Sequence, residues 1–166
     1  MDTIEVTTAV ERPPAAVFPV VRDVTTYPEY SRYLREVRER GDGGEGTRYV
    51  LRFGWWKLAY DAHTRVTGVD EPHRLDWEVT RDVEADGQWR LDPEDDGAAA
   101  TVRFLVSFDP ESVSPSVVDL PRLVSFDRVV EKATDLIEAE GKRVVERVIA
   151  DLEGERRDVD LTVEYR

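Results

Sequence analysis

The sequence predicts an α+β fold in which a curved antiparallel sheet of about six to seven strands wraps around a long C-terminal helix. Three observations lead to this prediction. Apolar residues alternate with a period of two between residues 34 and 109, a long helical period follows, and two short helical segments precede the strands. A sheet with one apolar face must bury that face, and only the last helix is long enough to cover it.

The chain begins with a predicted strand and two short helices. TIEVTTAV alternates apolar and polar residues, as a half-buried strand does. ERPPAAVFPVVRDV then places Pro13 and Pro14 where a first helical turn tolerates them, and Pro19 inside the segment predicts a short or kinked helix. The segment VTTYPEYSRYL after it predicts a second short helix, with three tyrosines spaced to lie on one side of it.

The middle of the chain predicts consecutive strands. The GDGGEG turn separates strands over 34–40 and 47–54, and the segments LAYDAHTRVTGV, RLDWEVT, GQWRL and ATVRFLVSF continue the period of two. The connections between these strands are short, so neighbours should pair antiparallel as a meander.

The longest helical pattern follows an irregular, proline-rich connection. Ser125 is a plausible N-cap and Gly154 a plausible end, which gives about 28 residues and a length of about 40 Å. Gly141 interrupts the apolar stripe of this helix, where a side chain would be expected. DVDLTVEYR alternates again, so residues 1–154 are expected to form one domain and 155–166 a tail or an added edge strand.

Composition limits the possible functions. The chain has 36 acidic and 23 basic residues, a net charge of −13, and only three lysines. This balance is typical of halophilic proteins from a salt-rich cytoplasm and opposes binding to nucleic acid or to anionic membranes. Without cysteine there can be no disulfide or thiolate site, and no apolar segment suits a leader or a membrane span. We therefore expect a cytoplasmic protein without stable membrane insertion.

The order of elements, together with VVRDVTTYPEYSRYL after the first strand, resembles the START-like (SRPBCC, helix-grip) superfamily. Within it, the resemblance is to the polyketide cyclase/dehydrase branch and to coenzyme Q-binding and ribosome-association-toxin-like proteins. It covers about residues 3–153. Its most specific local pattern is Asp23-Val24 followed by Tyr27-Pro28 and Tyr30.

The resemblance implies an apolar cavity between the curved sheet and the long helix. The residues agree, because the predicted inward positions mix large rings with small side chains and Gly141 lies opposite. The tyrosines of the second short helix are expected at the mouth of this cavity. The alternative is that these rings simply fill the core and that Gly141 marks a bend. The predicted ligand-binding residues are Tyr27, Tyr30, Tyr49, Phe53, Tyr60, Trp77, Trp89, Phe104, Phe108, Ile137 and Gly141.

No catalytic or metal-binding constellation stands out. Asp61, His63 and Arg65 share one side of a strand, but that side alternates against the apolar set and is expected to face solvent. His73 falls in a turn. If the protein is an enzyme, Tyr60, Thr64 and Arg103 are the inward-pointing candidates. No cofactor and no metal are expected.

Three functions stay open. The first is a non-catalytic carrier or sensor of a hydrophobic small molecule, with a lipid or isoprenoid quinone implied by the resemblance. The second is a cyclase or dehydratase whose pocket orients a reactive chain. The third is a protein-interaction module that uses the tyrosine helix or the adjacent Trp55 and Trp56, of which one is expected to be exposed. The C-terminal strand could also pair across a homodimer.

Overall fold

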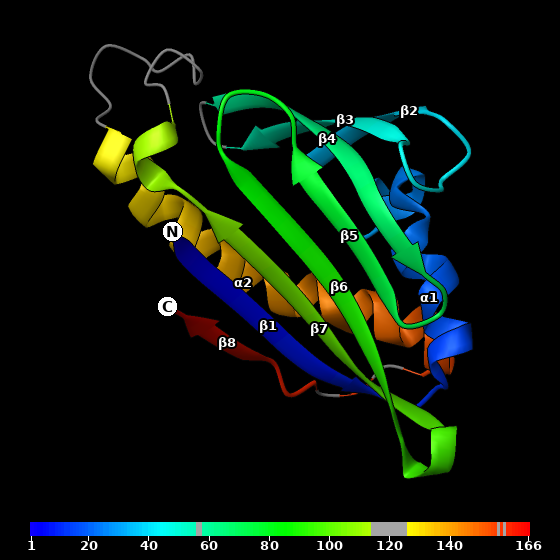
Figure 1. Cartoon of the computed structure of the whole chain (residues 1–166). Helices are drawn as coiled ribbons and strands as arrows, with labels where there is room; N and C mark the ends of the chain where they lie inside the picture. The colour runs from blue at the N-terminus through cyan, green and yellow to red at the C-terminus, as the bar shows by residue number, and fades with distance from the viewer. Residues whose placement is uncertain (56–57, 114–125, 156, 158) are drawn as a thin grey trace.

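In the computed structural model, one eight-stranded antiparallel sheet wraps around a single long helix (Figure 1). The structure describes residues 1–55, 58–113, 126–155, 157 and 159–166, without the side chains of 55, 58 and 126–138. The predicted helix-grip architecture is thereby confirmed. The eighth strand lies in the C-terminal residues, for which the sequence allowed a tail or an added edge strand.

The strands follow one another as a meander, and the first strand closes it. In spatial order the sheet reads β2 (Leu34–Arg40), β3 (Arg48–Trp55), β4 (Leu58–Asp70), β5 (Arg74–Val79), β6 (Ala85–Glu94), β7 (Ala99–Phe108), β1 (Asp2–Val10) and β8 (Thr162–Tyr165). All neighbours pair antiparallel, as short connections require. The sheet therefore has two edges, β2 and β8.

Two short helices, each containing a proline, connect β1 to β2. The helix α1 (Pro14–Arg22) begins at Pro14, with Pro13 extended at its N-cap, and Pro19 lies inside this nine-residue helix. The tyrosine segment forms η1 (Val24–Glu29), a 3₁₀ helix that ends at Tyr30. Two further 3₁₀ turns are η2 (Asp95–Gly97) and η3 (Pro110–Ser112).

The long helix α2 (Phe126–Glu153) crosses one face of the sheet, which we call the inner face (Figure 1). Its C-terminal half and α1 pack on one end of that face. The core there includes Phe18, Leu91 and Ile149, each at most 1% exposed, together with Val10 and Val102. No helix within the described part of the chain is long and apolar enough to cross a membrane.

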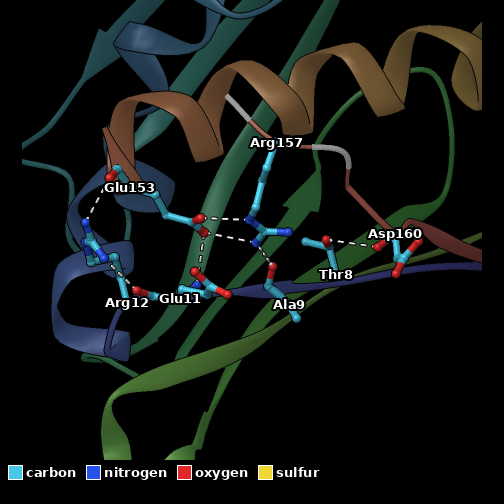
Figure 2. A network of polar contacts seen from close by, with 7 residues as sticks. All are labelled: Thr8, Ala9, Glu11, Arg12, Glu153, Arg157 and Asp160. Carbon is cyan, nitrogen blue, oxygen red and sulfur yellow. Dashed lines mark hydrogen bonds and ion pairs between the residues drawn. The ribbon is translucent and has the colours of Figure 1, made fainter. Parts of the chain in front are cut away.

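A polar network ties the end of α2 to β1 and to the C-terminal segment (Figure 2). The Glu153 carboxylate accepts hydrogen bonds from the Arg157 guanidinium at 2.7 and 3.0 Å and from the Glu11 backbone N–H at 3.0 Å. Arg157 also donates to the Ala9 carbonyl at 2.9 Å. The Arg157 guanidinium holds the pKa of Glu153 below its ordinary value. The network thus fixes where the chain leaves the helix.

We predict that Glu153→Gln destabilises the fold by about 1–3 kcal/mol at neutral pH, since the Glu153 side chain is only 7% exposed and accepts charge-assisted hydrogen bonds. A lowered folded-state pKa gives stability that is present above the ordinary value and is lost as the pH falls through the folded-state value. The difference in Tm between the variant and the wild type should therefore narrow between neutral pH and about pH 3. A constant difference would contradict this prediction, and Glu155→Gln serves as an exposed control.

Candidate functional site

The inner face changes from fully to partly buried along every strand of the central sheet. In β7, Ala100 and Val102 are buried whereas Phe104, Val106 and Phe108 are half-buried. The same change runs from Leu75 to Val79 in β5 and from Val66 to Tyr60 in β4, and in β6 from Leu91 to Trp89 and Ala85, with Gly87 between them still buried. Because neighbouring strands are antiparallel, these half-buried residues all lie at one end of the sheet. We call this region the half-buried end.

Three aromatic side chains, Trp77, Trp89 and Phe104, form a ring cluster toward the half-buried end. The register places Trp89 opposite both Leu75 and Phe104. The Phe104 ring lies 4.5 Å from that of Trp89 at 46°, and 6.0 Å from that of Trp77 at 18°. Trp77 and Phe104 therefore form a nearly parallel pair. Their half-buried surface is apolar, broad and flat.

Gly87 creates the seat on which Trp77 lies. The two residues are directly opposite in the β5–β6 ladder. A Cβ atom at position 87 would stand 2.1 Å from Trp77 Cζ2, a distance that no packing allows. The indole therefore covers the backbone of β6 because residue 87 has no side chain. Sequence reasoning missed Gly87, since only the register reveals its neighbour.

The other predicted ring residues of the sheet are on the inner face, as the alternation implied. Phe53 faces Tyr60 across β3 and β4, and Phe108 faces Ala85. Tyr60 and Phe108 are half-buried, while Phe53 is 37% exposed. Burial, together with the nearby Asp82 charge, raises the pKa of Tyr60. These residues extend the apolar surface beyond the ring cluster.

Tyr49 is a fully buried residue of β3, opposite Thr64 on β4. Its side chain is 3% exposed, and its hydroxyl has no hydrogen-bond partner within the described residues. Burial raises the pKa of Tyr49, and the adjacent Glu39 carboxylate contributes to the shift. Tyr49 is therefore a core residue, in the same buried cluster as the apolar side chains of α1.

The three tyrosines around η1, which the sequence predicted to share one side, have different neighbours. Tyr27 packs against the core and donates its hydroxyl to the Val21 carbonyl. Tyr30 is buried toward α2, where burial and the Asp151 carboxylate raise its pKa to about 12. The Tyr33 ring lies beneath the Arg32 guanidinium, 5.1 Å from its centroid. Tyr30 still has a helical backbone and donates its N–H to the Tyr27 carbonyl, whereas Tyr33 lies beyond the end of η1, so helical spacing does not relate it to the other two.

Tyr30 also lines a crevice of about 290 Å³ between η1 and α2, together with Arg147, Ala150, Asp151 and Glu29. Arg147 donates to the Tyr30 carbonyl at 2.6 Å and pairs with Glu140 at 3.4 Å. Glu140 is 6% exposed and also pairs with Arg143 at 3.6 Å. These contacts attach η1 to the helix. The acidic sequence around Glu140 gave no sign that this carboxylate is buried.

The catalytic candidates are divided between the two faces. Thr64 and Tyr60 are on the inner face and half-buried. Arg103 is on the outer face, 3.8 Å from Asp92 and 4.0 Å from Glu5, so the expectation that it points inward is wrong. It alternates with Val102 and Phe104, which are inward. Asp61, His63 and Arg65 are also on the outer face, where Asp61 pairs with Arg52 and Arg65 with Glu78.

Several predicted residues lie outside the part of the chain that the structure describes. They include the side chain of Ile137 and the other side chains of α2 before residue 139. The side chain of Trp55 and the whole of Trp56 are also outside it. Within the described residues, no group of three His, Asp or Glu side chains is placed to hold a metal ion.

At Gly141, where the sequence suggested a void, the described residues leave the surroundings of the missing side chain open except on one side. A Cβ atom there would lie 3.9 Å from Leu161 Cδ2, and among the described residues no other neighbour comes within 4 Å. Leu161 belongs to the C-terminal segment before β8. The space left by the missing side chain is thus flanked by a residue of a different element.

The sheet wrapped around α2 is a helix-grip fold of the START-like type. A family model described as polyketide cyclase/dehydrase and lipid transport matches residues 1–153, and the chain belongs to this family. None of the curated protein sequences matches the chain. The tail beyond residue 153 lies outside the family match.

Solved structures share the fold at low sequence identity. An aromatase/cyclase, ZhuI from Streptomyces sp. R1128, is similar with a TM-score of 0.69 and 16% identity over 92% of this chain and 94% of that one. A START superfamily protein from Mycobacterium smegmatis gives a TM-score of 0.64 and 14% identity over 92% and 99%. A protein from Thermus thermophilus gives 0.65 and 11% over 92% and 97%. At these identities the likeness concerns the fold alone.

We predict that Gly87→Ala costs about 1–3 kcal/mol, because the new methyl group displaces the Trp77 indole. Chemical denaturation measures the cost, and a shift in tryptophan emission reports the displaced ring. The cost should largely vanish when Trp77→Ala is also present, since the two residues are in contact. An equal cost in both backgrounds would contradict the seat assigned to Gly87.

Gly141→Ala should have the opposite effect. The added methyl group meets only Leu161 among the described residues, at an ordinary contact distance, and alanine favours the interior of a helix by about 0.5–1 kcal/mol over glycine. We expect a higher midpoint of denaturation by that amount. A loss of stability would show that the helix needs glycine at this position for another reason.

Proposed function

We propose that the protein binds a hydrophobic small molecule, lipid-like or isoprenoid quinone-like, between the inner face of the sheet and α2. The observation that carries this proposal is the half-buried ring cluster of Trp77, Trp89 and Phe104. The family description, with its polyketide cyclases, dehydrases and lipid transport, supports the same class of ligand.

The physical argument rests on how differently the two ends of the inner face are packed. At one end, residues such as Leu91 and Ile149 are at most 1% exposed. At the other, the largest apolar side chains of the sheet keep part of their surface accessible. Leaving aromatic surface uncovered forgoes about 25 cal/mol per Å², so a ligand that covers it gains that free energy.

The geometry of the ring cluster favours a ligand with a planar unsaturated group. Trp77 and Phe104 are within 18° of parallel, and aromatic rings prefer offset stacking against another flat system. A quinone ring or a cyclised polyketide has such a face, whereas a saturated chain would use only the apolar area. The Tyr60 and Thr64 side chains supply the few polar groups that fix a ligand's orientation.

A cyclase or dehydratase activity is the second candidate. It is favoured by Tyr60 and Thr64, which are four residues apart on the inward side of β4 and could orient a reactive carbonyl chain. Turnover of a model polyketide chain that is lost in the double variant Tyr60→Phe, Thr64→Val would support an enzyme. Retained ligand binding without turnover would support a carrier.

The direct test is mass spectrometry of an organic extract of the purified protein. A stoichiometric lipid or quinone would name the ligand. Decylubiquinone is a suitable probe for the extracted protein, because quinones quench tryptophan fluorescence and two of the four tryptophans are in the ring cluster. An empty extract together with no saturable quenching would overturn the proposal.

We predict that Phe104→Ala weakens decylubiquinone binding by about tenfold or more, since it removes the ring between Trp77 and Trp89. The matched control is Leu105→Ala, which truncates the next residue of the same strand on the outer face. Quenching titrations should give wild-type affinity for this control. Equal weakening in both variants would indicate a general loss of structure instead of a binding role.

A further inference from the structure

We propose that the C-terminal segment 159–166 is a wall of the ligand space and that Leu161 sets the width of ligand this space accepts. The inference rests on the proposed function and deepens it, because it identifies a residue that selects among hydrophobic ligands. The segment lies beyond the residues that the family model matches.

The C-terminal segment adds one further row of side chains, which we call a column, to the inner face. In the β1–β8 ladder, Val163 is opposite Val6, whose neighbour on β7 is the inward-facing Phe104. Side chains of an extended chain alternate between faces, so positions 159, 161 and 163 share the inner side. Val159 is 2% exposed and belongs to the core, while Leu161 and Val163 are half-buried. Burial therefore changes along this column as it does along the sheet strands.

Leu161 contacts α2 at Gly141. Residue 141 is one turn before Val145, which packs against the core, so it belongs to the helix face that points to the sheet. Leu161 Cδ2 lies 3.9 Å from the place of its missing Cβ. The leucine thus lies against the helix where the helix has no side chain of its own.

Hydrogen bonds to β1 fix the C-terminal segment on both sides of Leu161. On one side, Thr8 Oγ1 donates to the Asp160 carbonyl at 3.1 Å, and Arg157 donates to the Ala9 carbonyl (Figure 2). On the other, the Thr3 and Arg166 backbones exchange two hydrogen bonds of 2.8 Å. A side chain anchored in this way imposes a steric limit, whereas a loose tail would move aside for a larger ligand.

From its position, its contact and its anchoring, we assign to Leu161 the role of limiting the width of the ligand. Apolar pockets discriminate through volume, and one methylene group changes relative affinity by about 10–200-fold where the fit is close. Shortening Leu161 should widen the space between β1 and Gly141, and lengthening it should narrow that space. The effect should depend on the size of the ligand rather than on its polarity.

The test uses neutral quinones of increasing width: a dimethoxy-methyl-benzoquinone with one ring, menadione with two fused rings, and hydroxymethylanthraquinone with three. Since the chain has no cysteine, these quinones cannot form thiol adducts. For Leu161→Ala we expect affinity for the three-ring probe, relative to the one-ring probe, to rise about tenfold. For Leu161→Phe we expect that ratio to fall. Quenching titrations measure both ratios.

Three further variants separate an effect on the width of the ligand space from an effect on the stability of the fold. Val159→Ala truncates the same segment in the core, so it should lower the midpoint of denaturation and leave the affinity ratio unchanged. Leu161→Val supplies a smaller change if Leu161→Ala proves too unstable to titrate. Gly141→Ala, which narrows the same space from the helix side, should shift the ratio toward the one-ring probe.

The outcomes distinguish the two proposals. Suppose that wild type binds the probes and that Phe104→Ala weakens this binding, while the affinity ratio stays constant in all Leu161 variants. That result refutes the proposal that Leu161 limits ligand width and leaves the proposed ligand site supported. If no probe quenches wild type saturably and the extract is empty, the ligand site itself is refuted and the wall with it. A ratio that changes in Val159→Ala as in Leu161→Ala would also refute the assignment to Leu161.

Discussion

The constraint on which this structure depends is the burial of one apolar face of a strongly curved sheet by a single long helix. Eight strands present more apolar surface than one cylinder of about 10–12 Å can cover. The two ends of the inner face are therefore covered to different extents. At one end α1, η1 and the last turns of α2 add enough side chains to exclude water, and at the other end rings stay half-buried. Such an arrangement favours a binding surface, because a ligand that covers the remaining aromatic area gains the free energy of its burial.

Charge is arranged so that it does not compete with this burial. The outer face carries rows of Arg–carboxylate pairs, such as Arg52 with Asp61 and Arg65 with Glu78, where solvent screens each pair. The side chains of Glu140 and Glu153 are each only 7% exposed, and each pairs with arginine. A negative net charge can therefore coexist with an apolar inner face, because the carboxylates either remain in solvent or are neutralised where they are buried.

Alternation was enough to predict the sheet and the inward position of its rings, since a period of two fixes the face of every residue once one face is known. Spacing failed where the backbone is irregular. A helical period relates Tyr27, Tyr30 and Tyr33 to one side, but Tyr33 lies beyond the end of η1 and the three rings contact different residues. The error at Arg103 has another origin, because an inward Arg103 contradicts its alternation with Phe104.

The two glycines show why the rest could not be predicted. Gly87 and Gly141 look alike in sequence, each a small residue among apolar neighbours, yet their meaning depends on a partner from another element. Trp77 covers Gly87 because the β5–β6 register makes them opposite, and Leu161 faces Gly141 because the pairing of β8 with β1 returns the chain to the helix. At Gly87 the indole takes the room that a side chain would need, whereas at Gly141 Leu161 only borders that room. The shape of the inner face is therefore set by pairs of residues that the fold brings together, and no single segment of the sequence contains that information.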